Sequence, residues 1–309
     1  DPANNWHLLQ ARNHFDQVRK ELLAKAPECQ PVIHRIDELS KRLKKSLKTY
    51  LKERLEVRRS ELAKGLGTNL FGSLIYDVQK SFASMMATLS TKPGHQPGLP
   101  KEVDKELRQL LHPGDVLLTR KEFVFTNYFL PGYWPHGSLH LGSMDTLEEL
   151  GLARQDNFRK YEEQLRKLDS NDPSRALEAL KDGVHLRTLR SPLGADSIVV
   201  IRPELKSCHL VEAIDRVLQH AGKPYDFDFD FTRSDRMVCT EVIYRAYDGV
   251  GDLRFQLTKR AGRMTLSAMD LIHMALQGKH FKVVAAFIPK DNPKLLFEMD
   301  ATQAIQSFC

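Results

Sequence analysis

The spacing of hydrophobic residues changes about one third of the way along the chain. Between residues 5 and 90 they recur every three or four positions, as on one face of a helix, and the clearest series is Ile36, Leu39, Leu43, Leu47, Leu51 and Leu55. A second segment, Leu70 to Leu89, is amphipathic and nearly uncharged. The pattern predicts a helical N-terminal module over residues 1–91.

Residues 92–100 interrupt this pattern with three prolines and two glycines, a composition typical of a linker. Beyond them, short β-like runs at 116–119, 137–141, 197–201 and 281–288 accompany helical patterns at 148–168, 208–221 and 239–247. Because strands and helices are clustered and do not strictly alternate, we expect an α+β domain over residues 101–309.

Composition narrows the class of protein. The chain has 309 residues, of which 41% are hydrophobic and 28% charged, enough for two modest domains and too apolar for a disordered chain. No run approaches the roughly 18 apolar residues of a membrane span. The four cysteines are scattered and form no C-x-x-C pair, which argues against a disulfide scaffold and a zinc ribbon.

The positive charge is confined to the N-terminal third. Residues 1–100 hold 17 basic and 10 acidic residues, a balance of +7, whereas the remainder hold 29 and 30, a balance of −1. Most of the excess lies in residues 41–59, which could meet an anionic membrane surface or be an ordinary solvated helix face. Aromatic residues do not interleave with these charges, so we expect no nucleic-acid partner.

One cysteine has a sequence context that suits a nucleophile. Cys239 follows a polar loop and opens an apolar-periodic segment with Val242 and Ile243, which predicts a helix start. Unpaired N–H groups and the positive end of the helix dipole lower the pKa of a thiol there. The alternative is a buried, inert cysteine.

Two other residues could assist such a thiol. His136 stands at the start of a predicted strand, from which its ring could reach a neighbouring helix, although a surface or capping histidine is the alternative. Glu178 lies in an apolar setting before a turn and could orient an imidazole, or be a helix-surface carboxylate. Spacing alone does not choose Glu178 over neighbouring acids.

Six segments together resemble a known family, the YiiX/YebB-like branch of the NlpC-type papain-like cysteine hydrolases. In order they are Pro113–Arg120, Pro135–Gly142, Leu177–Val184, Ile198–Arg202, Gly222–Asp226 and Val238–Tyr244. This branch is circularly permuted, so that the His-bearing strand precedes the Cys-bearing helix, an order shared with lecithin retinol acyltransferase. The resemblance covers about residues 110–290 and implies a permuted papain-like domain with an N-terminal helical extension.

The resemblance assigns the nucleophile and the base. Cys239 matches the nucleophile of the family's V-C-S-E segment, with Thr240 in place of the usual serine. His136 matches the base in the strand segment, with Pro135 and Gly137 as local departures.

The remaining site residues also come from the resemblance. Glu178 matches the third polar residue of the family, and Tyr225 in G-x-P-Y-D matches a tyrosine that lines the active site and could help hold the oxyanion. His140, on or near the same strand face as His136, is an alternative third member. Relatives have a short hairpin where this chain has residues 146–172, so we expect a helical insertion there that could cover the cleft.

The implied chemistry is that of a thiol hydrolase or acyltransferase. A thiolate of Cys239 would attack an amide, ester or thioester carbonyl, with no metal and no cofactor. We expect acyl-lipid or acyl-protein substrates, because apolar aromatic residues that suit an acyl chain precede His136. They are Phe123, Phe125, Tyr128, Phe129, Tyr133 and Trp134. The alternatives are a peptidase or amidase acting on cell-wall or protein (iso)peptide bonds, and a non-catalytic interaction protein on a papain-like scaffold. The compartment stays open between a bacterial cytoplasm and a cell envelope, with membrane association as one alternative.

Overall fold

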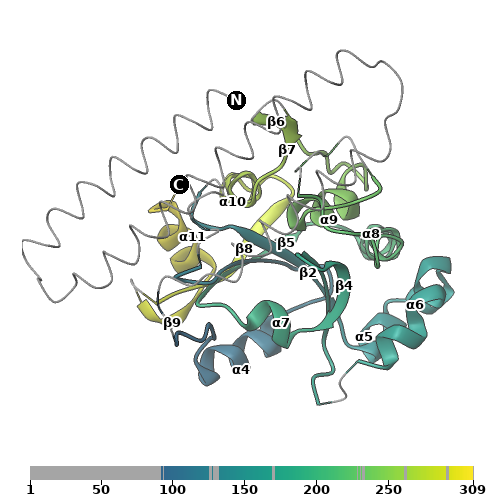
Figure 1. Cartoon of the computed structure of the whole chain (residues 1–309), viewed down its shortest axis with the longest axis horizontal. Coiled ribbons are helices and arrows are strands. Elements are labelled where there is room, and N and C mark those ends of the chain that lie inside the picture. Colours follow the sequence, from purple (N-terminus) through teal and green to yellow (C-terminus); the bar gives the residue numbers. More distant parts are fainter. Residues whose placement is uncertain are drawn as a thin grey trace, which may run out of the picture. The chain divides into compact units, whose positions relative to one another are not determined.

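The structure is a computed structural model that describes residue 92 and residues 94–308, apart from 125–126, 128–131, 169–170, 228, 230, 232–233, 261–262 and 290–291 (Figure 1). The predicted helical module of residues 1–91 lies outside the described residues, and so do its basic segment 41–59, Cys29 and Cys309. The division of the chain into module, linker and catalytic domain stays a prediction.

The fold is built on one antiparallel sheet of seven strands. Its order is β4-β3-β2-β1-β5-β8-β9, so β1 and β5 occupy the centre. The strands are β1 (Val116–Arg120), β2 (His136–Gly142), β3 (Arg175–Leu180), β4 (Gly183–Thr188), β5 (Ser197–Pro203), β8 (Phe281–Ile288) and β9 (Asn292–Phe297). A separate two-stranded sheet pairs β6 (Thr258–Arg260) with β7 (Arg263–Thr265).

Helices cover both faces of the seven-stranded sheet (Figure 1). On one face lie α8 (Ser207–Leu218), α9 (Cys239–Tyr247), α10 (Ala268–Leu276) and α11 (Glu298–Gln306); on the other lie α4 (Lys101–Leu110) and the short α7 (Arg190–Leu193). Val116 and Leu118 of β1 pack toward α8–α11, whereas Leu117 between them packs toward α4 and α7. Central strands buried on both faces read as continuous apolar runs.

The α+β class is confirmed, together with the strands predicted at 116–119, 137–141, 197–201 and 281–288 and the helices predicted at 208–221 and 239–247. Residues 148–168 are largely helical, as their pattern predicts, but they do not form a single helix. The segment instead contains α5 (Met144–Glu149), η3 (Leu152–Arg154) and α6 (Asp156–Arg166). Gly151 separates the first two with a backbone φ of +91°, a conformation that suits glycine and ends a helix.

The segment expected to cover the cleft packs elsewhere. Its helices follow Gly142, at the end of β2 opposite His136, and α6 is anchored to α8. Asp215 of α8 accepts hydrogen bonds from the Phe158 backbone N–H (2.9 Å) and the Asn157 amide (3.0 Å). The expectation of a lid is therefore wrong.

No helix among the described residues is long and apolar enough to cross a bilayer.

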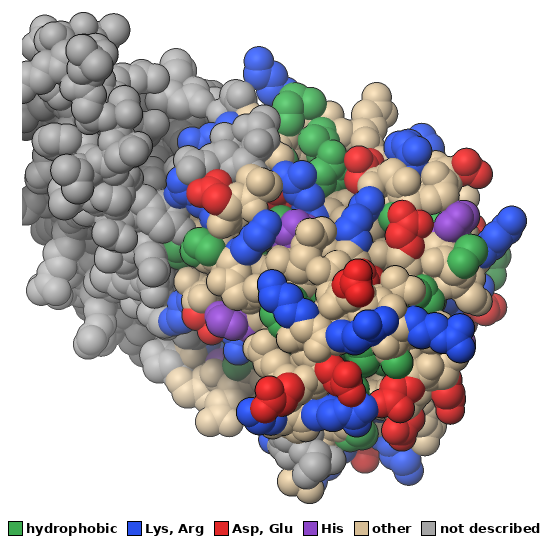
Figure 2. Space-filling model, turned by 90° about the vertical axis from the view of Figure 1, so that its right-hand side faces the viewer, with side chains coloured by type: hydrophobic (Ala, Val, Ile, Leu, Met, Phe, Trp, Pro, Cys, Tyr) green, Lys and Arg blue, Asp and Glu red, His purple; other side chains and the backbone are tan. Residues whose placement is uncertain are grey.

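The surface of the described part carries a balanced charge. On the face shown in Figure 2, basic and acidic side chains are interspersed and form no broad patch of one sign. This agrees with the near-neutral composition of residues 101–309 and leaves the basic excess of the chain to residues 1–100. Long-range attraction to anionic surfaces is therefore a property to look for in the N-terminal third.

Candidate active site

The thiol of Cys239 lies at the start of α9. The helix begins at this residue, directly after Val238, whose extended backbone forms the N-cap. Cys239 is 6% exposed, and the backbone N–H groups of Gly137 and Thr240 hydrogen-bond to its sulfur. These donors and the helix N-terminus favour the thiolate, as predicted from the sequence context.

A glycine in β2 lets the helix approach the sheet. A Cβ atom at Gly137 would lie 2.8 Å from the Cδ1 atom of Ile243 on α9 and 3.3 Å from the Cδ2 atom of Leu118. A larger residue would require the ends of the Ile243 and Leu118 side chains to shift, next to the N–H of residue 137 that donates to the thiol. The local departure at this position thus fits the close packing of β2 against α9.

The imidazole of His136 joins the thiol to a carboxylate. His136 is the first residue of β2, and its Nε2 lies 2.9 Å from Oε2 of Glu178. The ring also hydrogen-bonds to Cys239. Because Nε2 already contacts Glu178, the bond to Cys239 is made by Nδ1. The side chain of His136 is 20% exposed, whereas that of Glu178 is 1% exposed. A substrate can therefore reach the imidazole while the carboxylate stays out of water.

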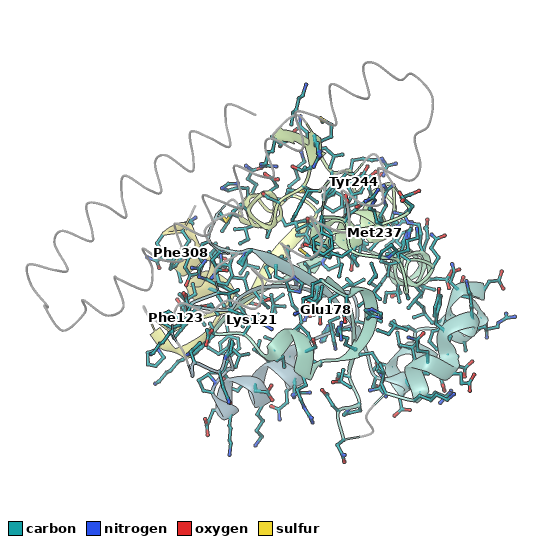
Figure 3. The ribbon with its side chains drawn as sticks, viewed as in Figure 1. Lys121, Phe123, Glu178, Met237, Tyr244 and Phe308 are labelled. Carbon is teal, nitrogen blue, oxygen red and sulfur yellow. The ribbon has the colours of Figure 1, made fainter. Side chains whose placement is uncertain are left out.

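Strand pairing puts Glu178 within reach of His136. Glu178 sits in β3 directly opposite Ser138 of β2, two residues beyond His136. The prediction that it precedes a turn is confirmed, because β3 and β4 form a hairpin; the alternative of a helix-surface carboxylate is wrong. Figure 3 labels Glu178 in the sheet and Met237, which leads into α9.

The electrostatics of the three groups favour a charged pair. Burial alone lowers the pKa of His136, but hydrogen bonds to Cys239 and Glu178 and the negative charges of both raise it to about 10. Burial raises the pKa of the Cys239 thiol, but the hydrogen bond and charge of His136 outweigh it and lower the pKa. Burial likewise opposes ionisation of Glu178, yet His136 holds its pKa below the ordinary value. The three contacts therefore favour an ion pair of thiolate and imidazolium beside an ionised carboxylate.

Two residues not found from the sequence hold the carboxylate. The Ser191 hydroxyl of α7 donates a short hydrogen bond to Oε1 of Glu178, and Nε of Arg187 lies 3.4 Å from the same oxygen. These contacts fix Oε1, so the other carboxylate oxygen, Oε2, faces His136. Only the path of the chain after β4 brings Ser191 here, so no sequence motif marks it.

The other predicted site residues differ in position. Tyr225 is near the thiol: burial first, and then the charges of Cys239 and Asp226, raise its pKa above the ordinary value. His140 is four residues, roughly 13 Å, along β2 from His136. Its Nδ1 donates to the His112 carbonyl at 2.9 Å, and it is 3% exposed. The structure therefore does not bring this alternative third residue to the thiol.

A second buried carboxylate, on the helix that carries the thiol, was missed by sequence reasoning. Glu241, two residues after Cys239, is 0% exposed, and its Oε1 accepts from Nε and Nη2 of Arg245 at 3.0 and 2.8 Å. Burial raises the pKa of Glu241 to about 7, because the hydrogen bond and charge of Arg245 offset only part of its effect. Among the described residues, no group of three or more His, Cys, Asp or Glu side chains could hold a metal ion.

Replacing Ser191 with alanine should lower kcat about tenfold with little change in KM, because a hydrogen bond to a charged group contributes about 1.5–3 kcal/mol. Ser191 lies in α7, and the only side-chain hydrogen bond of its hydroxyl within the described part of the chain is the one to Glu178. Steady-state kinetics test this. Ser191→Thr retains the hydroxyl and should recover most of the rate, and Ser207→Ala, at an exposed serine, is the matched control. Equal rates for Ser191→Ala and wild type would show that the contact is unimportant.

Replacing Glu178 with glutamine should slow the reaction about a hundredfold and shift its pH dependence. The carboxylate raises the pKa of His136, so its loss lowers that pKa below about 10. Activity that needs the imidazolium disappears as pH rises through this pKa, and the alkaline limb of kcat/KM should therefore move to lower pH. An unchanged alkaline limb would contradict the contact.

Comparison with known proteins places this site in a family. Residues 110–305 match the permuted papain-like amidase enzymes of the YaeF/YiiX type, the C92 family. No curated protein matches the chain. The crystal structure of metalloprotein yiiX from Escherichia coli O157:H7 is similar over 63% of this chain and 92% of that one, with 17% identity and a TM-score of 0.34. The family match spans more than half of the chain, so the resemblance noted in the sequence is confirmed, and the chain belongs to the permuted papain-like amidases of the C92 family, a class of cysteine hydrolases.

Proposed function

We propose that this chain is an amidase that transfers the acyl group of its substrate to Cys239 and then to water. The observation that supports this most directly is the position of His136, between the thiol and Glu178. A buried carboxylate, an imidazole and a thiol in this order match the orienter, base and nucleophile of a catalytic triad.

In the first step the thiolate attacks the carbonyl carbon of the amide. The carbonyl oxygen becomes an oxyanion. The N–H of Cys239 can donate to it, because the first N–H groups of a helix have no partner within the helix. The imidazolium of His136 then gives its proton to the leaving nitrogen as the C–N bond breaks. A thioester on Cys239 and a free amine are the products of this step.

In the second step water resolves the thioester. The neutral imidazole of His136 accepts a proton from water as the oxygen attacks the thioester carbonyl, and the thiolate leaves. Glu178 remains charged throughout and stabilises each imidazolium that forms. An acceptor alcohol or amine in place of water would make the same intermediate serve acyl transfer.

The aromatic residues beside the thiol favour an apolar acyl group. Tyr225 and Phe227 have ring centroids 4.9 Å apart, and Phe229 lies 6.2 Å from Tyr225. All three are only partly buried, so their rings can meet a substrate. Of the aromatic residues expected to serve this purpose, Trp134 is 1% exposed in the core, while Phe125, Tyr128 and Phe129 lie outside the described residues.

A panel of substrates tests the proposal. Full-length protein and Cys239→Ala would be incubated with N-acyl amides, phospholipid vesicles and muropeptides, and the products identified by mass spectrometry. We expect cleavage of the N-acyl amides by wild type alone. Cleavage confined to muropeptides would transfer the proposal to peptide bonds, and no cleavage by wild type of any member would favour a non-catalytic interaction protein.

The basic segment 41–59 leads to a prediction about membranes. Replacing Lys44, Lys45, Lys48 and Lys52 with glutamate should weaken binding to anionic vesicles and leave hydrolysis of a small soluble substrate unchanged. Binding of the wild-type chain should also fall with salt, because the Debye length shrinks from about 10 Å at 0.1 M to about 3 Å at 1 M. Vesicle sedimentation measures both. Salt-independent binding, or equal binding by the variant, would mean that these charges are an ordinary solvated face.

A further inference from the structure

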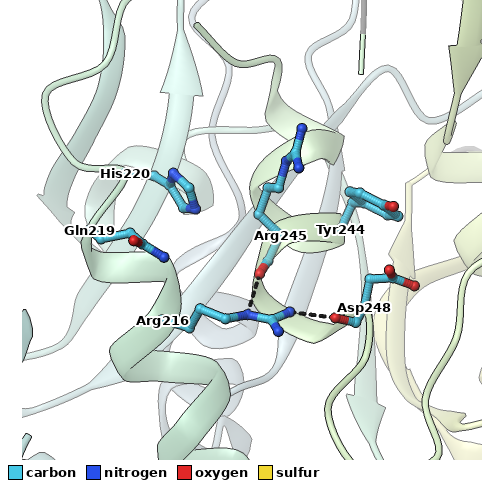
Figure 4. A pocket seen from close by; sticks show the side chains of 6 residues that line it. All are labelled: Arg216, Gln219, His220, Tyr244, Arg245 and Asp248. Carbon is cyan, nitrogen blue, oxygen red and sulfur yellow. Dashed lines mark hydrogen bonds between the residues drawn. The ribbon is translucent and has the colours of Figure 1, made fainter. Parts of the chain in front are cut away.

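A polar pocket lies at the opposite end of the helix that carries Cys239. It has a volume of about 270 Å³ and is lined by Arg216, Gln219, His220, Tyr244, Arg245 and Asp248 (Figure 4). Arg245 is six residues beyond Cys239, a rise of roughly 9 Å along α9. The pocket is not lined by the thiol, His136 or Glu178, so the reaction proposed above leaves it unexplained.

Arg216 brings a positive charge to this pocket, and the carboxylates of Glu212 and Asp248 act on it without forming an ion pair. It reaches from α8 to the last turn of α9, where Nε donates to the Arg245 carbonyl at 2.8 Å and Nη2 to the Asp248 carbonyl at 2.6 Å (Figure 4). No carboxylate of the described residues forms an ion pair with Arg216. Its Nη1 donors therefore remain for a ligand, while the guanidinium already covers the negative end of the helix.

His220 is held as a neutral N–H donor. Its Nδ1 lies 2.8 Å from the ammonium nitrogen of Lys223, which can only donate, so Nδ1 accepts and the ring proton is on Nε2. Burial first, and then the charges of Lys223, Arg245 and Arg216, lower the pKa of His220 to about 4. The ring faces the pocket at neutral pH with a donor that no other contact of the described residues uses (Figure 4).

The carboxylate that lines the pocket already has hydrogen-bond partners. The Asp248 carboxylate receives the Phe255 N–H at 3.0 Å and also hydrogen-bonds to the Tyr244 side chain. Arg245 is paired with Glu241. What the pocket offers is a guanidinium, an imidazole N–H and the exposed amide of Gln219, three groups able to donate around one cavity.

We propose that this pocket binds a phosphate group, whose terminal oxygens accept from Arg216, His220 and Gln219. Guanidinium donors bind phosphate oxygens through charge-assisted hydrogen bonds, and the neutral imidazole adds a directed donor without a competing proton equilibrium above pH 5. The phosphate belongs either to a small soluble molecule or to a lipid headgroup. The site does not depend on the proposed amidase activity.

Calorimetric titration of the full chain at fixed ionic strength tests the site, with inorganic phosphate in one arm and monomeric dihexanoyl phosphatidate in the other. The short-chain lipid avoids vesicles, which residues 41–59 would bind without this pocket. We expect saturable binding of phosphate to wild type. Binding of the lipid at least tenfold tighter than of phosphate would identify a headgroup site, and equal affinity a site for soluble phosphates.

Variants make the test specific. Arg216→Gln should weaken binding about tenfold or more, the loss expected for one hydrogen bond to a charged group. Arg254→Gln is the matched control, since Arg254 also donates to backbone carbonyls, those of Gly251 and Leu253, but lies outside the pocket. Because Arg216 also caps α9, the double change Gln219→Ala/His220→Phe provides a second variant that leaves the cap in place. Absence of saturable binding in both arms, or equal affinity of this double variant and wild type, would overturn the proposal.

Discussion

Replacing Cys239 with alanine should reduce turnover to the uncatalysed background while the protein stays folded. The thiolate is the only group in the proposed reaction that bonds to the substrate, so nothing else can form the thioester. Alanine suits the first position of a helix and removes a single sulfur atom from a site that is 6% exposed. Steady-state rates and thermal unfolding of the purified variant measure the two halves of this expectation.

Cys208 provides the control for this experiment. It is exposed, whereas Cys239 is buried, and it lies in the first turn of α8 away from His136. Cys208→Ala should keep wild-type activity. If Cys208→Ala abolished turnover and Cys239→Ala did not, the assignment of the nucleophile would be wrong.

Replacing His136 with alanine should lower kcat/KM by roughly three to four orders of magnitude. The imidazole both maintains the thiolate and protonates the leaving nitrogen, and general acid–base assistance alone contributes about 10²- to 10⁴-fold. Removing the imidazolium also removes the hydrogen bond and charge that lower the pKa of Cys239, so burial then raises that pKa.

The alkylation rate of Cys239 by iodoacetamide separates these two effects. In wild type the thiolate should persist to lower pH than that of an ordinary cysteine, and the alkylation rate should depend less on pH. In His136→Ala the rate should rise steeply only at alkaline pH. A neutral-pH alkylation rate in the variant equal to that of wild type would show that His136 does not ionise the thiol.

The strands at the centre of the sheet could be predicted because their environment is simple. Val116–Leu118 and Val283–Ile288 are apolar on successive residues, which is the pattern of a strand buried on both faces. The hairpin of β3 and β4 could not be predicted in this way. Its sequence Arg175–Leu180 is rich in good helix formers, and pairing with β2 and β4 overrides that preference.

The parts of the candidate site that depend on local sequence could be predicted, and the contacts between distant segments could not. The helix start at Cys239 and the strand start at His136 are local features, and the family motifs assigned their roles. The bond between His136 and Glu178 depends on the strand register that pairs Glu178 with Ser138. Neither segment alone determines this register. The contact of Arg187 depends on the pairing of β3 with β4, and that of Ser191 on the position of α7 after β4.

Mass spectrometry of the acid-quenched reaction tests the central claim, the acyl-enzyme on Cys239, most directly. The full-length protein would be mixed with an activated N-acyl substrate, quenched within the first turnover, and digested for peptide mapping. We expect the peptide that contains Cys239 to gain the mass of the acyl group, and the adduct to disappear when hydrolysis is allowed to finish. Turnover without any adduct on Cys239, or with the acyl group on Cys208, would contradict the account.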